Sequence, residues 1–214
     1  MGPKATTNYR EYESEDFLAV LQMILDTWKF SDWIPGENAK TSGVYYLLEI
    51  LASSSKVWVA TQQDEVVGVI GVKDTHLQNF HPIYELKKSL AYCQIMTRKE
   101  GRNKFLQFIQ TDGLDQELLH SVKHHFDAEL TLLIVKEGHK GEGIGNSLYN
   151  TFLNYLNLQR LSNFFVFTDS SCNYPFYEHK GLHRVAEKPF YWHDPDSTPT
   201  QEEYYLYSGS LERA

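Results

Sequence analysis

The sequence has few cysteines, no long apolar run and no excess of basic residues. Its two cysteines, Cys93 and Cys172, lie far apart and form neither a Cys-x-x-Cys motif nor a metal-ligand pair, a usage typical of a reducing compartment. The longest apolar runs fall well short of the roughly 20 residues that span a bilayer. The first seven residues, Met1 to Thr7, contain no apolar signal segment. We therefore expect a cytoplasmic protein.

The formal net charge of −8 argues against nucleic acid or a membrane surface as a partner, because both require a basic protein surface. An acidic protein suits a cationic substrate, although acidity also serves solubility alone. The chain has 214 residues, of which 42% are hydrophobic, and this is enough to bury one core. We expect a single domain over residues 1–214.

The best-known nucleotide-binding motifs are also absent. No Lys-Ser or Lys-Thr follows the glycine-rich stretch at 138–145, which excludes a P-loop. A dinucleotide-binding fingerprint lies early in a βαβ unit and has an acidic residue about 20 residues further on. Asp169 ends the next predicted strand, but it lies further away, and no second mononucleotide-binding half follows.

The sequence does contain a strand, a glycine-rich turn and a helix in succession. Ala128 to Val135 is an apolar run of strand length, and Leu148, Phe152 and Leu156 follow at helical spacing. The turn between them carries four glycines, Gly138, Gly141, Gly143 and Gly145. Such a turn can aim successive backbone N–H groups at an anion, and the start of a helix favours phosphate in the same way. The alternative is that the glycines only permit a tight turn.

Residues 140–145, Lys-Gly-Glu-Gly-Ile-Gly, resemble the pyrophosphate loop of the GCN5-related N-acetyltransferase (GNAT) family. That loop reads Arg or Gln, two residues, Gly, one residue, Gly or Ala, and Lys140 keeps a cation at its first position. A second stretch, Phe164 to Leu182, resembles the next strand and short helix of the family, which end in Phe-Tyr-Glu and a glycine. The family asparagine seven residues before the tyrosine is Ser170 here, while Asn173 stands four residues before it.

The resemblance implies an α+β fold with a mixed sheet, and the rest of the pattern agrees with it. We expect a strand at 7–13, a helix that Ser14 caps, a helix at 39–53, and a hairpin of strands at 56–61 and 66–72. Helical pieces at 83–96, 105–109 and 115–126 form an insertion over 74–125, between the third and fourth strands. A strand at 185–191, a polar loop at 193–200 and a strand at 204–211 close the sheet. The insertion could cover the acceptor site or build a homodimer interface.

The resemblance also implies how acetyl-CoA would bind. Backbone groups of Leu133, Ile134 and Val135 would hold pantetheine and the oxyanion. The pyrophosphate would rest on the loop residues Lys140, Gly141, Glu142, Gly143, Ile144, Gly145 and Asn146, and Asn173 is a further CoA contact. Tyr177 matches the family tyrosine that protonates the CoA thiolate. Its alternative role is to pack a short helix onto the sheet.

Acetylation of an amine also requires a base, because a primary amine is mostly protonated at neutral pH. Asp127, Glu129 and Thr131 alternate on one face of the central strand, with Ala128, Leu130 and Leu132 on the other. Glu129 and Asp127 are therefore the candidate bases. The resemblance also places the site of the amine acceptor beside the loop between the first two helices. Four aromatic residues are therefore candidates for the wall of this site, here called the acceptor wall, or could instead pack in the core: Trp28, Phe30, Trp33 and Tyr45.

The sequence thus predicts an N-acetyltransferase that moves an acetyl group from acetyl-CoA to a primary amine of a small molecule or peptide. Direct transfer in a ternary complex is favoured over a covalent route through Cys172, which has no base beside it in sequence. The alternatives are an inactive acyl-CoA sensor or scaffold, a different acyl group such as succinyl, and a protein acceptor. We expect no metal, because no carboxylate or cysteine near His120, His124 and His125 completes a site.

Overall fold

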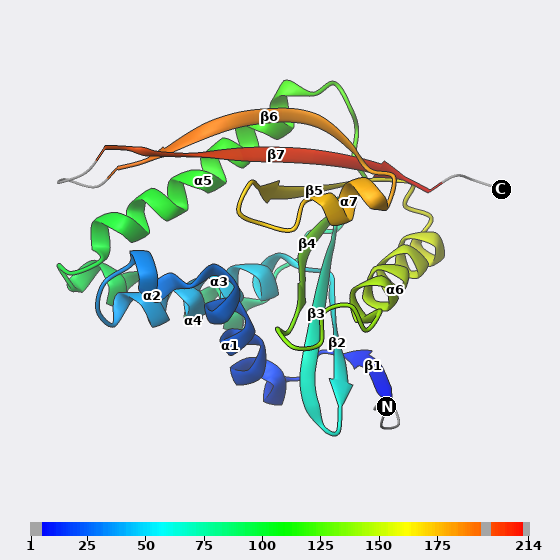
Figure 1. The fold of residues 1–214 in the computed structure, drawn as a ribbon, viewed down its shortest axis with the longest axis horizontal. Helices are drawn as coiled ribbons and strands as arrows, with labels where there is room; N and C mark the ends of the chain where they lie inside the picture. Colours follow the sequence, from blue (N-terminus) through cyan, green and yellow to red (C-terminus); the bar gives the residue numbers. More distant parts are fainter. Residues whose placement is uncertain (1–5, 194–197, 212–214) are drawn as a thin grey trace.

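The computed structural model describes residues 6–193 and 198–211, so residues 194–197, the middle of the expected loop at 193–200, lie outside the described residues. Seven strands form one mixed sheet in the order β1-β2-β3-β4-β5-β7-β6 (Figure 1). The pair β4–β5 is parallel and the other pairs are antiparallel. The strands are β1 (Thr7–Glu11), β2 (Lys56–Gln62), β3 (Glu65–Asp74), β4 (Ala128–Val135), β5 (Asn163–Asp169), β6 (His183–Trp192) and β7 (Thr200–Ser210). The expected α+β class with a mixed sheet is confirmed.

Helices cover both faces of this sheet. The helices are α1 (Phe17–Trp28), α2 (Phe30–Trp33), α3 (Asn38–Ser53), α4 (Pro82–Thr97), α5 (Arg102–Ser121), α6 (Ile144–Gln159) and α7 (Pro175–His179). On one face, α6 buries Leu148, Phe152 and Leu156 against β2 to β5. On the other face, where Figure 1 shows α1 and α3, these helices bury a second cluster against β2, β3 and β4. No helix in the described part of the chain is long and apolar enough to cross a membrane.

The segment between β3 and β4 is helical, as expected, but its helices differ from the predicted ones. The sequence predicts separate helices at 105–109 and 115–126, whereas α5 runs unbroken through Gly113 and ends at Ser121. A glycine in an exposed helix costs only about 1 kcal/mol, and the packing of Leu114 and Leu118 on the same helix offsets this cost. The helix therefore continues where the sequence indicated a break.

The two inserted helices join distant parts of the fold. The turn between α4 and α5 is tied to α3, since Asn38 Nδ2 donates to Glu100 O at 2.6 Å. The far end of α5 lies over the other half of the sheet, where Leu118 packs with Phe165 of β5 and Leu206 of β7. The insertion therefore spans the face of the sheet opposite α6, from α3 to β7 (Figure 1).

A β-bulge in β4 changes which side chains face each layer. Gly71 and Val72 of β3 pair with Leu132 and Leu130, so Thr131 is an extra residue in β4. As a result, Leu130 packs in the α6 layer and Leu132 in the α1–α3 layer. The predicted alternation, with Leu132 on the same face as Leu130, is wrong at this position because a simple period of two does not continue through a bulge.

One glycine of β7 is required by close packing, and this gives a test of the fold. A Cβ on Gly209 would lie 2.3 Å from Cζ of Phe164, a ring that is 2% exposed. We expect Gly209→Ala to lower the free energy of unfolding by about 1–3 kcal/mol, because the buried ring would have to move. Urea denaturation measures this change.

Gly113→Ala is the matched control for that variant. Nothing lies within 4 Å of a Cβ at Gly113, which is exposed in the middle of α5. Alanine there should stabilise the protein by up to about 1 kcal/mol through helix propensity. Equal stability of the Gly209→Ala variant and the parent protein would contradict the packing described for Phe164.

Candidate active site

The pairing between β4 and β5 stops almost as soon as it begins. Only Ala128 and Glu129 of β4 pair with β5, opposite Phe164 and Phe165. On its other edge, β4 stays paired with β3 as far as Val135. One edge of β4 beyond Glu129 therefore has no strand partner among the described residues, and Figure 1 shows β4 and β5 diverging.

The register decides which backbone groups face that open edge. Lys136 N donates to Val67 O of β3 at 2.9 Å, and in an antiparallel pair hydrogen-bonded and non-hydrogen-bonded positions alternate. Leu133 and Val135 therefore direct their backbone N–H and C=O groups to the open edge. Ile134 directs its backbone groups to β3, where they take part in the pairing with Val69. Of the three predicted pantetheine-binding residues, Ile134 therefore has no backbone group directed at the open edge.

The glycine loop that follows β4 has the backbone needed for an anion-binding nest. Gly138, Gly141 and Gly143 have φ of +91°, +82° and +89°, conformations that favour glycine. The first hydrogen bond of α6 runs from Ser147 N to Gly143 O at 3.0 Å. The N–H groups of Ile144 to Asn146 precede it in the first turn, where helix geometry leaves such donors without intrahelical acceptors.

The end of β4, the start of α6 and the helix α7 meet at one point. A Cβ on Gly145 would lie 3.4 Å from Val135 Cγ2 and 3.9 Å from Phe176 Cε2. Tyr177, the next residue in α7, is 9% exposed, and burial raises the pKa of its hydroxyl. The structure thus brings Tyr177 to the same end of the sheet as the glycine loop and keeps its hydroxyl protonated.

The charged residues of the loop are paired with neighbours. Lys140 Nζ lies 2.6 Å from Glu137 Oε2, and both side chains are exposed. The carboxylate of Glu142 accepts a hydrogen bond of 2.9 Å from Gln62 on β2. Asn173 is exposed in the turn before α7, where its carbonyl accepts from Phe176 N at 3.1 Å. Lys140 can release its surface ion pair at little cost, because such pairs are worth under about 1 kcal/mol.

Glu129 lies where the two strands part, on the side of the sheet that carries α3 and α5. Its side chain is 20% exposed, and the nearest cation is Lys73 Nζ at 3.9 Å. Burial raises the pKa of Glu129, Lys73 opposes this effect, and the carboxylates of Glu49 and Asp112 add to it. A carboxylate with a raised pKa is a better proton acceptor than an ordinary one.

Asp127, the other predicted base, has a different role in the structure. Its Oδ2 accepts from the backbone N–H groups of Ser162 and Asn163, both at 2.9 Å, and its Oδ1 lies 3.1 Å from His76 Nε2. These hydrogen bonds hold the pKa of Asp127 below its usual value against the effect of burial. Asp127 joins the starts of β4 and β5 and is poorly suited to accept a proton.

Sequence reasoning missed two carboxylates of α5, Asp112 and Asp115. Burial raises the pKa of Asp115 to about 8, and Asp112, Glu129 and Asp169 contribute to the shift. Asp112 is exposed as a residue, and partial burial of its carboxylate raises the pKa to about 6, with a further contribution from Glu49 of α3. Asp115 Oδ1 is buried and has no hydrogen-bond partner among the described residues. Helical periodicity at 114–118 indicated a helix but not where its acidic side would face.

The predicted acceptor-wall aromatics pack chiefly against other aromatic rings of α3, the insertion and β6. Trp33 Nε1 donates to Trp28 O at 3.0 Å, and the Trp33 ring lies 5.4 Å from that of Trp192 on β6. Tyr45 packs edge-on against Phe105 of α5 at 5.1 Å, while Phe30 is fully buried. These residues therefore attach α2 and α3 to the insertion. Burial raises the pKa of Tyr45 to about 12. The carboxylates of Glu49 and Asp112 make smaller contributions, which places the Tyr45 hydroxyl near them.

Cys172 is not an activated nucleophile in this structure. Its thiol lies 3.3 Å from Asp169 Oδ2. Burial and that neighbouring carboxylate raise the pKa of the thiol to about 12. A thiol must ionise to attack a thioester, so this environment disfavours a covalent acetyl-cysteine.

Comparison with solved structures supports the fold that these features suggest. The agmatine N-acetyltransferase S171A variant aligns with a TM-score of 0.59 and 12% identity, over 96% of this chain and 99% of that one. An N-acetyltransferase from Staphylococcus aureus Mu50 aligns with a TM-score of 0.55 and 12% identity, over 97% and 100%. A protein from Desulfovibrio desulfuricans assigned to the GNAT family aligns with a TM-score of 0.54 and 15% identity, over 96% and 99%. The chain therefore has the GNAT acetyltransferase fold. No family model and no curated protein sequence matches it.

The raised pKa of Asp115 predicts a dependence of stability on pH. Its folded-state pKa of about 8 lies above its unfolded value of 3.8, so the folded protein holds this proton more tightly. The contribution of this bound proton to the free energy of unfolding is fully present below pH 4 and is lost as the pH rises toward 8. Asp115→Asn removes the buried charge and should stabilise the protein at pH 8, by on the order of 2 kcal/mol, with little effect at pH 4.

Thermal unfolding at several pH values measures this effect. Glu117→Gln, on the exposed side of the same helix and paired with Lys188, is the control that should show no such gain at pH 8. A uniform change in stability across the pH range would show that Asp115 does not carry a buried ionisation.

Proposed function

We propose that this protein is an acetyl-CoA-dependent N-acetyltransferase that acetylates a primary amine by direct attack within a ternary complex. The observation that carries the proposal is the open edge of β4, which leads directly into the glycine loop and the start of α6. An extended chain that ends in a pyrophosphate fits this arrangement, because backbone donors along an edge suit amide groups and a nest suits phosphate.

In this proposal the cofactor is held mainly by backbone groups. Leu133 and Val135 would bind the pantetheine amides at the open edge of β4. The pyrophosphate would accept hydrogen bonds from the amides at 143–146, and Lys140 would add its charge. A thioester beside β4 would place its carbonyl oxygen near backbone donors of this edge, and such donors stabilise a developing oxyanion by about 3 kcal/mol.

The acceptor would approach from the side of α3 and α5. Three acidic residues there, Glu49, Asp112 and Glu129, outnumber the two lysines paired with them, Lys73 and Lys88, even without Asp115, which its pKa of about 8 keeps largely protonated at neutral pH. This excess of negative charge favours an amine that arrives as a cation. We therefore propose a small cationic amine as the acceptor class in preference to a neutral one.

Chemically, the neutral amine nitrogen attacks the thioester carbonyl carbon, forming a C–N bond while the C–S bond breaks. Glu129 accepts the proton that the ammonium group must lose, directly or through a water. The attacking nitrogen must lose a second proton as the amide forms, and this proton passes to the departing thiolate, to which Tyr177 donates a hydrogen bond. Because burial raises the pKa of this hydroxyl above that of an ordinary phenol, hydrogen bonding rather than complete proton transfer is its expected contribution.

Binding of CoA tests the first half of the proposal. A valine at Gly143 would add bulk to the nest and strain a backbone whose φ is +89°. We expect Gly143→Val to weaken CoA binding at least tenfold, measured by calorimetric titration with CoA and acetyl-CoA. Gly181→Val is the matched control, because Gly181 also has a positive φ of +78° and open space around its Cβ but lies outside the loop.

The two valine variants separate strain from recognition. Both should lower stability to a similar degree, and only Gly143→Val should lose affinity for CoA. Equal CoA affinity in the parent protein and the Gly143→Val variant would refute the pyrophosphate assignment. Tight CoA binding without thiol release for any amine in a panel of mono- and polyamines would favour the acyl-CoA sensor instead.

The pH profile of turnover tests Glu129. A base must be deprotonated, so kcat/KM should rise with pH through the raised pKa of Glu129. Glu129→Gln should lower kcat by about 100-fold or more and remove that acidic limb. Glu11→Gln is the control, because Glu11 is an exposed carboxylate paired with Lys56 at 2.8 Å. This variant should keep the rise of kcat/KM with pH. An unchanged profile in Glu129→Gln would mean that another group is the base.

A further inference from the structure

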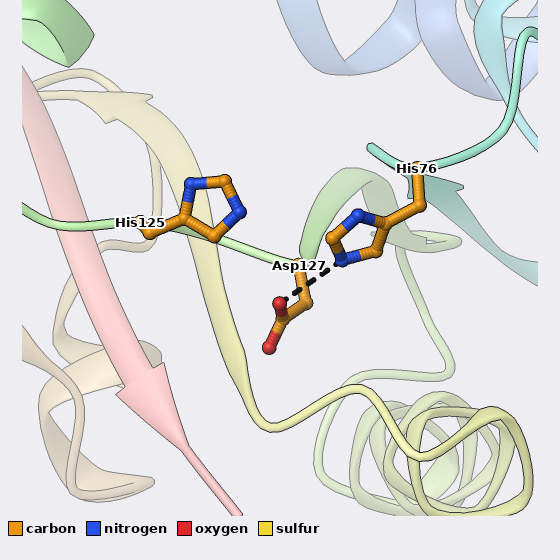
Figure 2. A group of neighbouring side chains, drawn as sticks. All are labelled: His76, His125 and Asp127. Carbon is orange, nitrogen blue, oxygen red and sulfur yellow. Dashed lines mark hydrogen bonds and ion pairs between the residues drawn. The ribbon is translucent and has the colours of Figure 1, made fainter.

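His76, His125 and Asp127 form a side-chain cluster that the proposed acetyl transfer does not use. Each residue offers one ligand atom, and the three atoms lie within 4.8 Å of one another. His76 follows the end of β3, while His125 and Asp127 immediately precede β4. Figure 2 shows the two imidazole rings on either side of the Asp127 carboxylate.

The spacing of these atoms is close to that of ligands on one metal ion. His76 Nε2 lies 3.1 Å from Asp127 Oδ1. Two ligand atoms bound at about 2.1 Å to one tetrahedral zinc ion lie roughly 3.4 Å apart, so this pair needs almost no adjustment. The His125 ring centroid is 5.9 Å from that of His76. His125 is exposed on a loop, so its ring can turn toward the other two without displacing core residues.

Surrounding hydrogen bonds already hold the backbone of this cluster in place. Asp127 Oδ2 accepts from the backbone of Ser162 and Asn163, which leaves Oδ1 directed at His76. Thr75 N donates to Asp127 O at 3.0 Å and Thr75 Oγ1 donates to Phe126 O at 2.7 Å, so the two loops are tied together. Ligands held by a second layer of hydrogen bonds are typical of protein metal sites.

We propose that His76, His125 and Asp127 bind a divalent zinc-like cation. Two imidazole nitrogens and one carboxylate oxygen suit Zn²⁺, and also Ni²⁺ or Co²⁺, whereas Mg²⁺ and Ca²⁺ prefer oxygen ligands alone. Three protein ligands leave the fourth position of a tetrahedral ion to water. From the sequence no metal is expected, because His76 stands at the opposite end of the insertion from His125 and Asp127.

The position of the site gives the cation a structural role. His76 and His125 stand at the two ends of the insertion that contains α4 and α5. A cation bound to both would close the loop formed by the insertion and hold it against the start of β4. The alternative to a cation site is that His76 and Asp127 form only a surface ion pair, and such pairs contribute little to the free energy of unfolding.

The cation site is separate from the proposed CoA site. Asp127 precedes β4 and the glycine loop follows it, and the strand between them has eight residues, a length of about 26 Å. Loss of cation binding therefore tests this inference without deciding the acetyltransferase proposal.

Calorimetric titration of the tag-free, full-length protein with ZnCl₂ is the direct test. We expect one Zn²⁺ per chain with a dissociation constant in the micromolar range. At a hundredfold excess over that constant, the melting temperature should rise by about 5 °C. MgCl₂ at the same concentration should give neither effect.

Variants identify the ligands. His125→Ala and His76→Ala, both at exposed positions, should each weaken Zn²⁺ binding at least tenfold and abolish the thermal shift while the protein stays folded. His120→Ala, an exposed histidine of α5 outside the cluster, should bind Zn²⁺ like the parent protein. The inference would be overturned if the parent protein bound no Zn²⁺, or if His76→Ala and His125→Ala bound it unchanged.

Discussion

The early end of hydrogen bonding between β4 and β5 is the constraint on which the rest of the structure depends. After Glu129 and Phe165 the two strands separate, while β4 remains bound to β3. A strand edge inside a sheet that is left unpaired needs other partners for its N–H and C=O groups. The same separation places Glu129 at the point of divergence and lets α6 and α7 meet beside Val135. One local feature of the sheet therefore relates the open edge of β4, Glu129 and the glycine loop to one another.

The insertion between β3 and β4 adds charged and aromatic side chains beside Glu129 that the sheet does not supply. Its second helix carries Asp112 and Asp115, and burial, with repulsion from neighbouring carboxylates such as Glu49 and Asp112, raises the pKa values of Asp112, Asp115 and Glu129. Aromatic side chains of α2 and α3 hold the insertion in place, chiefly through Phe105 and Phe108. The electrostatic environment of Glu129 thus comes in part from a segment that the sheet itself does not require.

The parts of the fold and site that local patterns determine could be predicted from the sequence. The glycine spacing at 138–145 identified the loop and the start of α6, and an apolar run of strand length identified β4. The bulge at Thr131 could not be predicted, because it depends on the register with β3. For the same reason the sequence did not distinguish Asp127, which the β5 backbone binds, from Glu129. The roles of Asp115 and of the His76–His125 pair depend on contacts between segments far apart in the chain.

The closeness of His76 and His125 has a consequence for how this chain could vary. The backbone leaves the sheet after β3 and returns before β4 at nearly the same place, with the two rings 5.9 Å apart. A loop whose ends already meet can change greatly in length at a small entropic cost, because that cost grows only with the logarithm of its length. This junction is therefore a point where whole segments can be exchanged, so that evolution or protein engineering can replace the carboxylate-bearing helix while the sheet and the glycine loop stay intact.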